Sequence, residues 1–99
     1  MSIQLPDSLT PQLAELARRH GAQRLVLFGS RARGDNRERS DIDLAVYGLD
    51  YTKAGQLRLD LEELPTLLEF DLVCVDAHTS PELLKNIERE GVTLYASEM

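Results

Sequence analysis

The chain has 99 residues, of which 42% are hydrophobic and 28% charged, and its net charge is −6 at pH 7. This length predicts a single domain over residues 1–99 with one modest hydrophobic core. The acidic balance argues against a protein that coats nucleic acid, which needs a positive surface, and no apolar run reaches the roughly 18 residues of a membrane span. One cysteine excludes an internal disulfide, and the first residues lack a secretory signal, so we expect a cytoplasmic protein.

The first 28 residues predict a helix followed by a buried strand. Thr10 is the expected N-cap of the helix, Pro11 its first residue and Gly21 its stop. The apolar stripe of this helix consists of Leu13, Leu16 and Ala17. Residues 25–28 are all apolar, which is typical of a buried strand.

Residues 30–40 are polar, and we expect one helical turn and a loop. A second strand is predicted over residues 41–47, where apolar residues alternate with Asp41 and Asp43. Because side chains alternate across a strand, both aspartates are expected on one face. Residues 52–64 then predict a helix that Pro65 interrupts.

The last third of the chain predicts one more strand, one more helix and a short final segment. Residues 70–75 predict a third strand, and Ser80 and Pro81 predict the start of a helix that Gly91 closes. Residues 92–95 form either a short edge strand or a tail. A short connection makes the first two strands antiparallel, whereas the helical crossover makes the second and third parallel. The expected fold is α/β in the α+β sense, a small mixed sheet packed by helices.

This topology brings one turn and several carboxylates together. Gly29 and Ser30 follow the first strand, Asp41 and Asp43 lie on the second, and Asp71 starts the third at the same end of the sheet. Two unit charges about 4 Å apart repel by about 4 kcal/mol at an effective dielectric of about 20, so such a cluster needs protonation or a divalent cation. Oxygen ligands favour Mg²⁺ or Mn²⁺, and two ions are expected.

The turn after the first strand predicts a phosphate-binding site. Backbone N–H groups at Gly29 and the hydroxyl of Ser30 suit the phosphates of a nucleotide. A metal site beside a phosphate cradle indicates nucleotidyl or phosphoryl transfer, with Asp71 helping to deprotonate the incoming hydroxyl. Arg33, and less securely Arg31, are expected to neutralise the departing pyrophosphate. Five of the eleven Lys and Arg residues lie within sixteen positions, and this local charge suits a small anion or a basic partner: Arg24, Arg31, Arg33, Arg37 and Arg39.

The pattern from Gly29-Ser30 through ten residues to Asp41-x-Asp43 resembles the signature of the DNA polymerase β nucleotidyltransferase superfamily. The longer sequence around this pattern, Gly-Ser-Arg-Ala-Arg-Gly followed by Ser-Asp-Ile-Asp-Leu, is similar to that of minimal nucleotidyltransferase (MNT) antitoxins. This resemblance implies a nucleotidyltransferase-type fold, ATP as substrate and a HEPN-domain ribonuclease toxin as partner in a hetero-oligomer. It also implies transfer of AMP to a toxin tyrosine, with Asp41, Asp43 and Asp71 as catalytic and metal-binding residues and Gly29, Ser30 and Arg33 as nucleotide-binding residues.

Several alternatives stay open at this point. Asp76 competes with Asp71 for the place of the third carboxylate, and Arg33 has Asp35 and Glu38 as structural partners within reach. The protein is alternatively an antitoxin that neutralises its partner by binding alone. Transfer to a small molecule is disfavoured by the chain's length, because such enzymes need a further domain to hold the acceptor.

Overall fold

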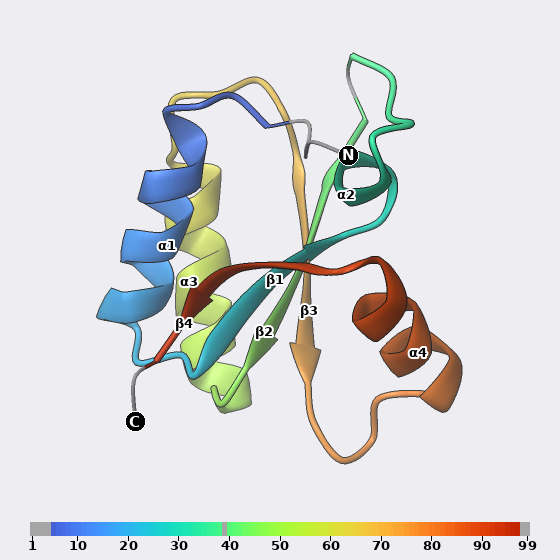
Figure 1. The fold of residues 1–99 in the computed structure, drawn as a ribbon. Coiled ribbons are helices and arrows are strands. Elements are labelled where there is room, and N and C mark those ends of the chain that lie inside the picture. The colour runs from blue at the N-terminus through green and yellow to red at the C-terminus, as the bar shows by residue number, and fades with distance from the viewer. Residues whose placement is uncertain (1–4, 39, 98–99) are drawn as a thin grey trace.

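A four-stranded mixed sheet with the order β3-β2-β1-β4 forms the centre of the molecule (Figure 1). The structure is a computed structural model that describes residues 5–38 and 40–97, so the predicted contribution of Arg39 lies outside the described residues. The helices and strands follow one another as α1 (Leu9–Arg19), β1 (Arg24–Phe28), α2 (Ser30–Arg33), β2 (Ile42–Tyr47), α3 (Tyr51–Glu62), β3 (Phe70–Val75), α4 (Pro81–Glu90) and β4 (Val92–Ala96).

The strand pairing confirms the predicted topology. β1 and β2 are antiparallel, β2 and β3 are parallel, and β4 lies antiparallel to β1 at the opposite edge from β3. Of the two expectations for residues 92–95, the edge strand is therefore correct. The α+β fold with a mixed sheet is confirmed as well.

Helix α1 begins earlier than predicted. Thr10 is not the N-cap, because the helix starts at Leu9 with Ser8 in the capping position. This start places Leu9, which is buried, in line with the predicted stripe. Pro11 still lies in the first turn, where the backbone N–H has no partner within the helix. The predicted stop is correct, since Gly21 takes a φ of 80° directly after the C-cap.

The boundaries of α3 also differ from prediction. The side chain of Asp50 accepts a hydrogen bond from the Lys53 N–H at 2.8 Å, so α3 starts at Tyr51 rather than at residue 52. The helix ends at Glu62, so Pro65 follows it and does not interrupt it. Ser80 caps α4 as predicted, with its hydroxyl accepting from the Leu83 N–H at 3.2 Å.

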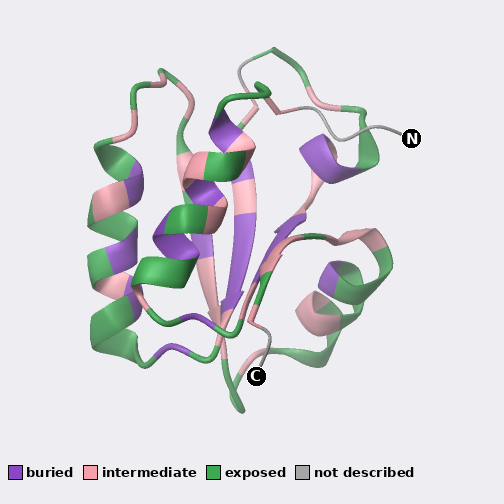
Figure 2. Ribbon diagram, turned by 60° about the vertical axis from the view of Figure 1, so that its left-hand side comes forward, coloured by how far each residue is buried: buried purple, intermediate pink, exposed green. Residues whose placement is uncertain are grey.

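The helices cover the two faces of the sheet unequally. α1 and α3 pack side by side on one face, and α4 packs on the other (Figure 1). Figure 2 shows that the buried residues are concentrated on the central strands and on the inward sides of the helices. The larger core lies under α1 and α3, whereas α4 contributes Ile87 to a small cluster with Val26 and Ala45. In the described part of the chain, no helix combines the length and hydropathy needed to cross a membrane.

Candidate active site

Two aspartates face each other across the parallel strands β2 and β3. Asp43 and Asp71 are register partners, and both occupy the sheet face opposite to Ile42 and Leu72, which point into the larger core. Asp71 is exposed and Asp43 is half-buried. The prediction that Asp43 and Asp71 meet at one end of the sheet is therefore confirmed, whereas the predicted convergence of three carboxylates is not, because no such group of three is found among the described residues.

Asp41 lies immediately before β2, which starts at Ile42 rather than at Asp41. It is exposed, and its charge still reaches Asp43. Burial, followed by the neighbouring carboxylates of Asp71 and Asp41, raises the pKa of Asp43 above its usual value. The carboxylates of Asp41, Asp43 and Asp71 therefore concentrate negative charge where β2 and β3 begin.

Gly29 links this acidic group to the turn after β1. Its φ is 75°, a conformation that residues with a Cβ rarely adopt. A Cβ at this position would overlap the Asp43 carboxylate oxygen, so the absence of a side chain lets Asp43 lie directly against the turn. Gly29 is thus required twice, for its backbone angle and for the close approach of Asp43.

Ser30 begins the short helix α2, as predicted. The N–H groups of Ala32 and Arg33 both donate to the Gly29 carbonyl at 3.1 Å, which closes the turn. α2 has only four residues, so any attraction for an anion comes from the local N–H groups of the turn rather than from a long helix dipole.

Arg33 has two acidic partners. Its Nε donates to Asp35 at 3.1 Å, and its Nη1 donates to Glu90 at 2.9 Å. The predicted structural pairing with Asp35 is confirmed, although the Arg33 side chain remains 43% exposed. Glu90 was not predicted as part of the site. It lies at the end of α4, just before the edge strand β4 that pairs with β1, and this long-range pairing brings it to Arg33.

Arg31 occupies a different place from the one expected. The residue is only 4% exposed, and its guanidinium donates to the backbone carbonyls of Glu38 and Ser40, each at 3.0 Å. These contacts turn the side chain toward the loop before β2, so Arg31 is not available to a departing pyrophosphate.

The competing carboxylate, Asp76, lies beyond the other end of β3. Its side chain accepts a hydrogen bond from the His78 N–H at 2.7 Å and closes a turn. Since β3 ends at Val75, the strand separates Asp76 from Asp71. The structure brings Asp71, and not Asp76, next to Asp43.

Cys74 and His20 have structural partners away from the acidic residues. Cys74 is directed away from the acidic face, with its Sγ 3.3 Å from the Leu49 carbonyl, and burial raises the pKa of its thiol. His20 lies 2.6 Å from Asp60 and joins the end of α1 to α3.

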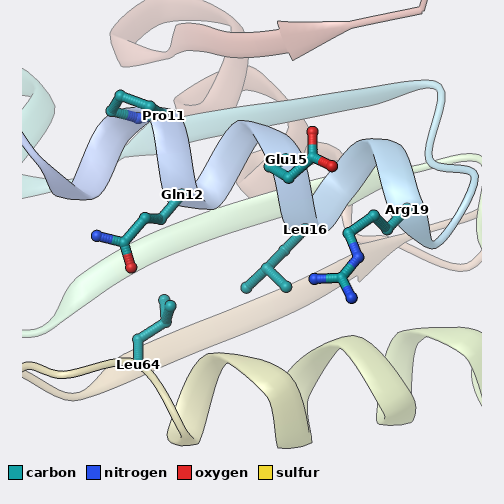
Figure 3. A pocket seen from close by; sticks show the side chains of 6 residues that line it. All are labelled: Pro11, Gln12, Glu15, Leu16, Arg19 and Leu64. Carbon is teal, nitrogen blue, oxygen red and sulfur yellow. The ribbon is translucent and has the colours of Figure 1, made fainter.

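A pocket between α1 and the segment that follows α3 lies apart from the acidic group. It encloses about 290 Å³, and Figure 3 shows side chains from both segments around it. It is on the sheet face that α1 and α3 cover, opposite to Asp43 and Asp71. Its lining consists of Pro11, Gln12, Glu15, Leu16, Arg19 and Leu64, which offers neither paired aspartates nor a glycine turn.

The acidic residues fit Mg²⁺ as a partial coordination set. Within residues 5–38 and 40–97, no three His, Cys, Asp or Glu side chains converge closely enough to enclose an ion by themselves. Mg²⁺ is commonly held by one or two carboxylates together with substrate phosphates. The half-buried Asp43 beside Asp71, with the turn at Gly29 adjacent, is an oxygen donor set of that incomplete kind.

Comparison with known proteins assigns this architecture to a family. The profile of the family described as "Polymerase beta, Nucleotidyltransferase" matches residues 12–99. The protein adenylyltransferase MntA of Thermococcus cleftensis is 34% identical over 67 residues. That alignment covers 68% of this chain and 54% of the relative, so the chain spans about half of the relative's length.

Solved structures show the same fold. A structure described as a minimal nucleotidyltransferase is 35% identical, with a TM-score of 0.70, and the match covers 86% of this chain and 88% of that one. A chain of a toxin–antitoxin complex crystallised with AMP-PNP is 26% identical, with a TM-score of 0.74. This second match covers 90% of this chain and 74% of that one.

Proposed function

The chain belongs to the polymerase β nucleotidyltransferase family, and on this basis we propose that it transfers AMP from ATP to a tyrosine of a HEPN-domain toxin, as the antitoxin of that pair. One observation carries the proposal. Asp43 lies against the Gly29 turn and directly opposite Asp71, so a phosphate cradle and two carboxylates share one site.

The relatives support the substrate and the partner. The Thermococcus cleftensis relative is named as a protein adenylyltransferase, and a related fold occurs in a toxin–antitoxin complex that holds the ATP analogue AMP-PNP. The sequence resemblance to MNT antitoxins adds the HEPN class of toxin. The relative's activity, the AMP-PNP complex and the sequence resemblance together support ATP as the nucleotide and a protein as the acceptor.

In the proposed reaction, the turn at Gly29 and Ser30 holds the phosphates of ATP. Asp41, Asp43 and Asp71 would hold Mg²⁺, with two ions expected, and when bound the metal supplies positive charge at the phosphates. Arg33 lies half-exposed beside the turn, paired with Asp35 and Glu90. When it leaves these two carboxylates, its guanidinium neutralises negative charge on the departing pyrophosphate.

The tyrosine oxygen forms a bond to the α-phosphorus of ATP, the bond from that phosphorus to the bridging oxygen breaks, and pyrophosphate leaves. Asp71, which is exposed on an edge strand, accepts the hydroxyl proton. This edge position also gives an acceptor side chain a route to the site from outside the sheet.

The proposal is tested by following label from ATP to the co-purified toxin. Label on the α-phosphate should appear on the toxin, whereas label on the γ-phosphate should not. Asp43→Asn should abolish the transfer, and Asp76→Asn, which removes a carboxylate at the other end of β3, should leave it intact. A toxin that stays unlabelled but is still silenced in a stable complex would instead establish an antitoxin that acts by binding alone.

A further inference from the structure

A polar loop connects the turn at Gly29 to Asp41. Ser30 starts α2, Asp41 directly precedes β2, and the connection between them is polar. Ala32 of α2 is buried in the larger core, but residues 34–40 that follow have no hydrophobic side chain, and the β1–β2 pairing reaches only as far as Asp43, so another interaction must fix the chain before Asp41. In Figure 1 the loop projects from α2 and returns to the start of β2.

The side chain of Arg31 provides that interaction. It leaves α2 and donates from Nε to the Ser40 carbonyl and from Nη2 to the Glu38 carbonyl, both at 3.0 Å. The residue is 4% exposed, although its side chain carries a full positive charge. Burying a guanidinium is costly unless its N–H groups are satisfied, so these carbonyls fix both the side chain and the loop.

The end of the loop is itself ordered around Ser40. The Ser40 N–H donates to the Arg37 carbonyl at 3.1 Å, and the Ser40 hydroxyl accepts from the Arg37 N–H at 2.8 Å. These two bonds tie Ser40 to Arg37 immediately before Asp41. A contact that holds the Ser40 carbonyl therefore also fixes where the chain enters β2.

We propose that Arg31 is a positioning residue that sets where Asp41 lies relative to the phosphate-binding turn at Gly29 and Ser30, whereas the pairing of Phe28 with Asp43 already fixes Asp43 beside that turn. This inference rests on the proposed function, and it assigns Arg31 no contact with substrate. It gives a physical reason for an arginine at this position, because a guanidinium reaches two carbonyls at once from a rigid fork. A lysine ammonium offers a compact charge without that geometry.

Arg31→Lys tests the proposal, with Arg58→Lys as the matched control. Arg58 also donates to a backbone carbonyl, that of Leu72, but from α3 on the other face of the sheet. With ATP saturating, we expect Arg31→Lys to raise the Mg²⁺ concentration for half-maximal transfer about tenfold, the lower end of what a lost supporting contact costs a metal site. The KM for ATP at saturating Mg²⁺ should change less than about twofold, and Arg58→Lys should match the wild type in both measurements.

A second readout does not depend on transfer. Mn²⁺ titrated with AMP-PNP present should raise the unfolding temperature of the wild type at lower metal concentrations than that of Arg31→Lys. Circular dichroism establishes that each variant is folded. Should the lysine variant fail to fold, Arg31→Met keeps much of the side-chain volume without a charge to bury, and the same shift is expected of it.

The outcomes separate the two proposals. A folded Arg31→Lys or Arg31→Met with the metal dependence of the wild type overturns the positioning role, as does failure of both variants to fold. If the wild type transfers no AMP but its metal response shifts in the variants, the positioning role stands and the proposed reaction falls. A wild type that neither transfers AMP nor responds to metal and nucleotide contradicts both.

Discussion

Gly29 and Asp43 form the most constrained contact in the site. The glycine takes a positive φ, and any side chain there would meet the Asp43 carboxylate. Sequence alone was sufficient to select both residues, because a glycine–serine turn and an Asp-x-Asp pair at this spacing have few structural uses. The burial of Arg31 and the contact between Arg33 and Glu90 were not predictable, because both depend on how a polar loop and a distant helix end fold back.

Gly29→Ala should therefore lose both stability and activity. Gly29 combines its positive φ with a ψ of −158°, a region that residues with a Cβ adopt only at a cost of about 1–3 kcal/mol, and displacement of Asp43 should add to this cost and remove AMP transfer. Gly21→Ala is the matched control, since Gly21 has a similar φ of 80° and open space where the Cβ would be placed. Urea unfolding and a transfer assay on both variants measure the difference. Equal destabilisation of the two would show that the contact with Asp43 has no structural consequence.

Asp43→Asn should stabilise the ligand-free protein while abolishing transfer. Burial and two neighbouring carboxylates raise the pKa of Asp43, so its charged form opposes folding and removing the charge relieves that penalty. The expected gain is about 0.5–2 kcal/mol at neutral pH, the range for relief of unfavourable charge. With a raised folded-state pKa, this gain should disappear as the pH falls below the unfolded value and Asp43 becomes protonated.

Urea unfolding of wild type and variant at neutral and at acidic pH measures this difference. Asp76→Asn is the comparison variant, because it removes a carboxylate that instead accepts a hydrogen bond in a turn. A loss of stability in Asp43→Asn at neutral pH would contradict the electrostatic account.

At the scale of elements, the sequence was most informative where its signals were local. The three predicted strands, the crossover between β2 and β3 and the cap of α4 were confirmed. The start of α1 was wrong because Leu9 is buried in line with the predicted stripe, and the helix therefore starts one residue before Thr10, with Ser8 in the capping position. Whether residues 92–95 form a strand depended on pairing with β1, a long-range contact that the local pattern does not contain.

The ion pair between α2 and α4 yields a prediction for nucleotide binding. Glu90 and Asp35 both neutralise Arg33, so ATP must compete with them for the guanidinium. Glu90→Gln should therefore lower the KM for ATP about two- to fivefold, because the lost ion pair is worth about 0.5–1 kcal/mol, which corresponds to that factor in binding. Steady-state transfer rates over a range of ATP concentrations measure this effect. A higher KM would show instead that Glu90 holds Arg33 in its binding position.

In the molecule as a whole, one face of the sheet supports the larger core and the other carries the acidic residues. α1 and α3 cover the larger core, while the face under α4 carries the acidic residues and ends at the exposed edge strand β3. A net charge of −6 makes the ligand-free state self-repelling around this site. Cations and a basic acceptor surface are the binding partners that this charge distribution favours.

Binding of Mg²⁺ and ATP together should stabilise the fold. A ligand at about 100 times its Kd adds about 2.7 kcal/mol to the free energy of unfolding, and a domain of this size gains about 4–8 °C in Tm per kcal/mol. Differential scanning calorimetry with both ligands should show this rise, and EDTA should remove it. The same Tm with and without saturating ligand would contradict a nucleotide site at the acidic residues.

The central claim is tested most directly by the intact mass of a HEPN-domain toxin co-purified with this protein, before and after incubation with Mg²⁺ and ATP. The account predicts a gain of one or more AMP units on the toxin, located on a tyrosine and absent when Asp41→Asn and Asp43→Asn are combined. An unchanged toxin mass with the wild-type protein would contradict it.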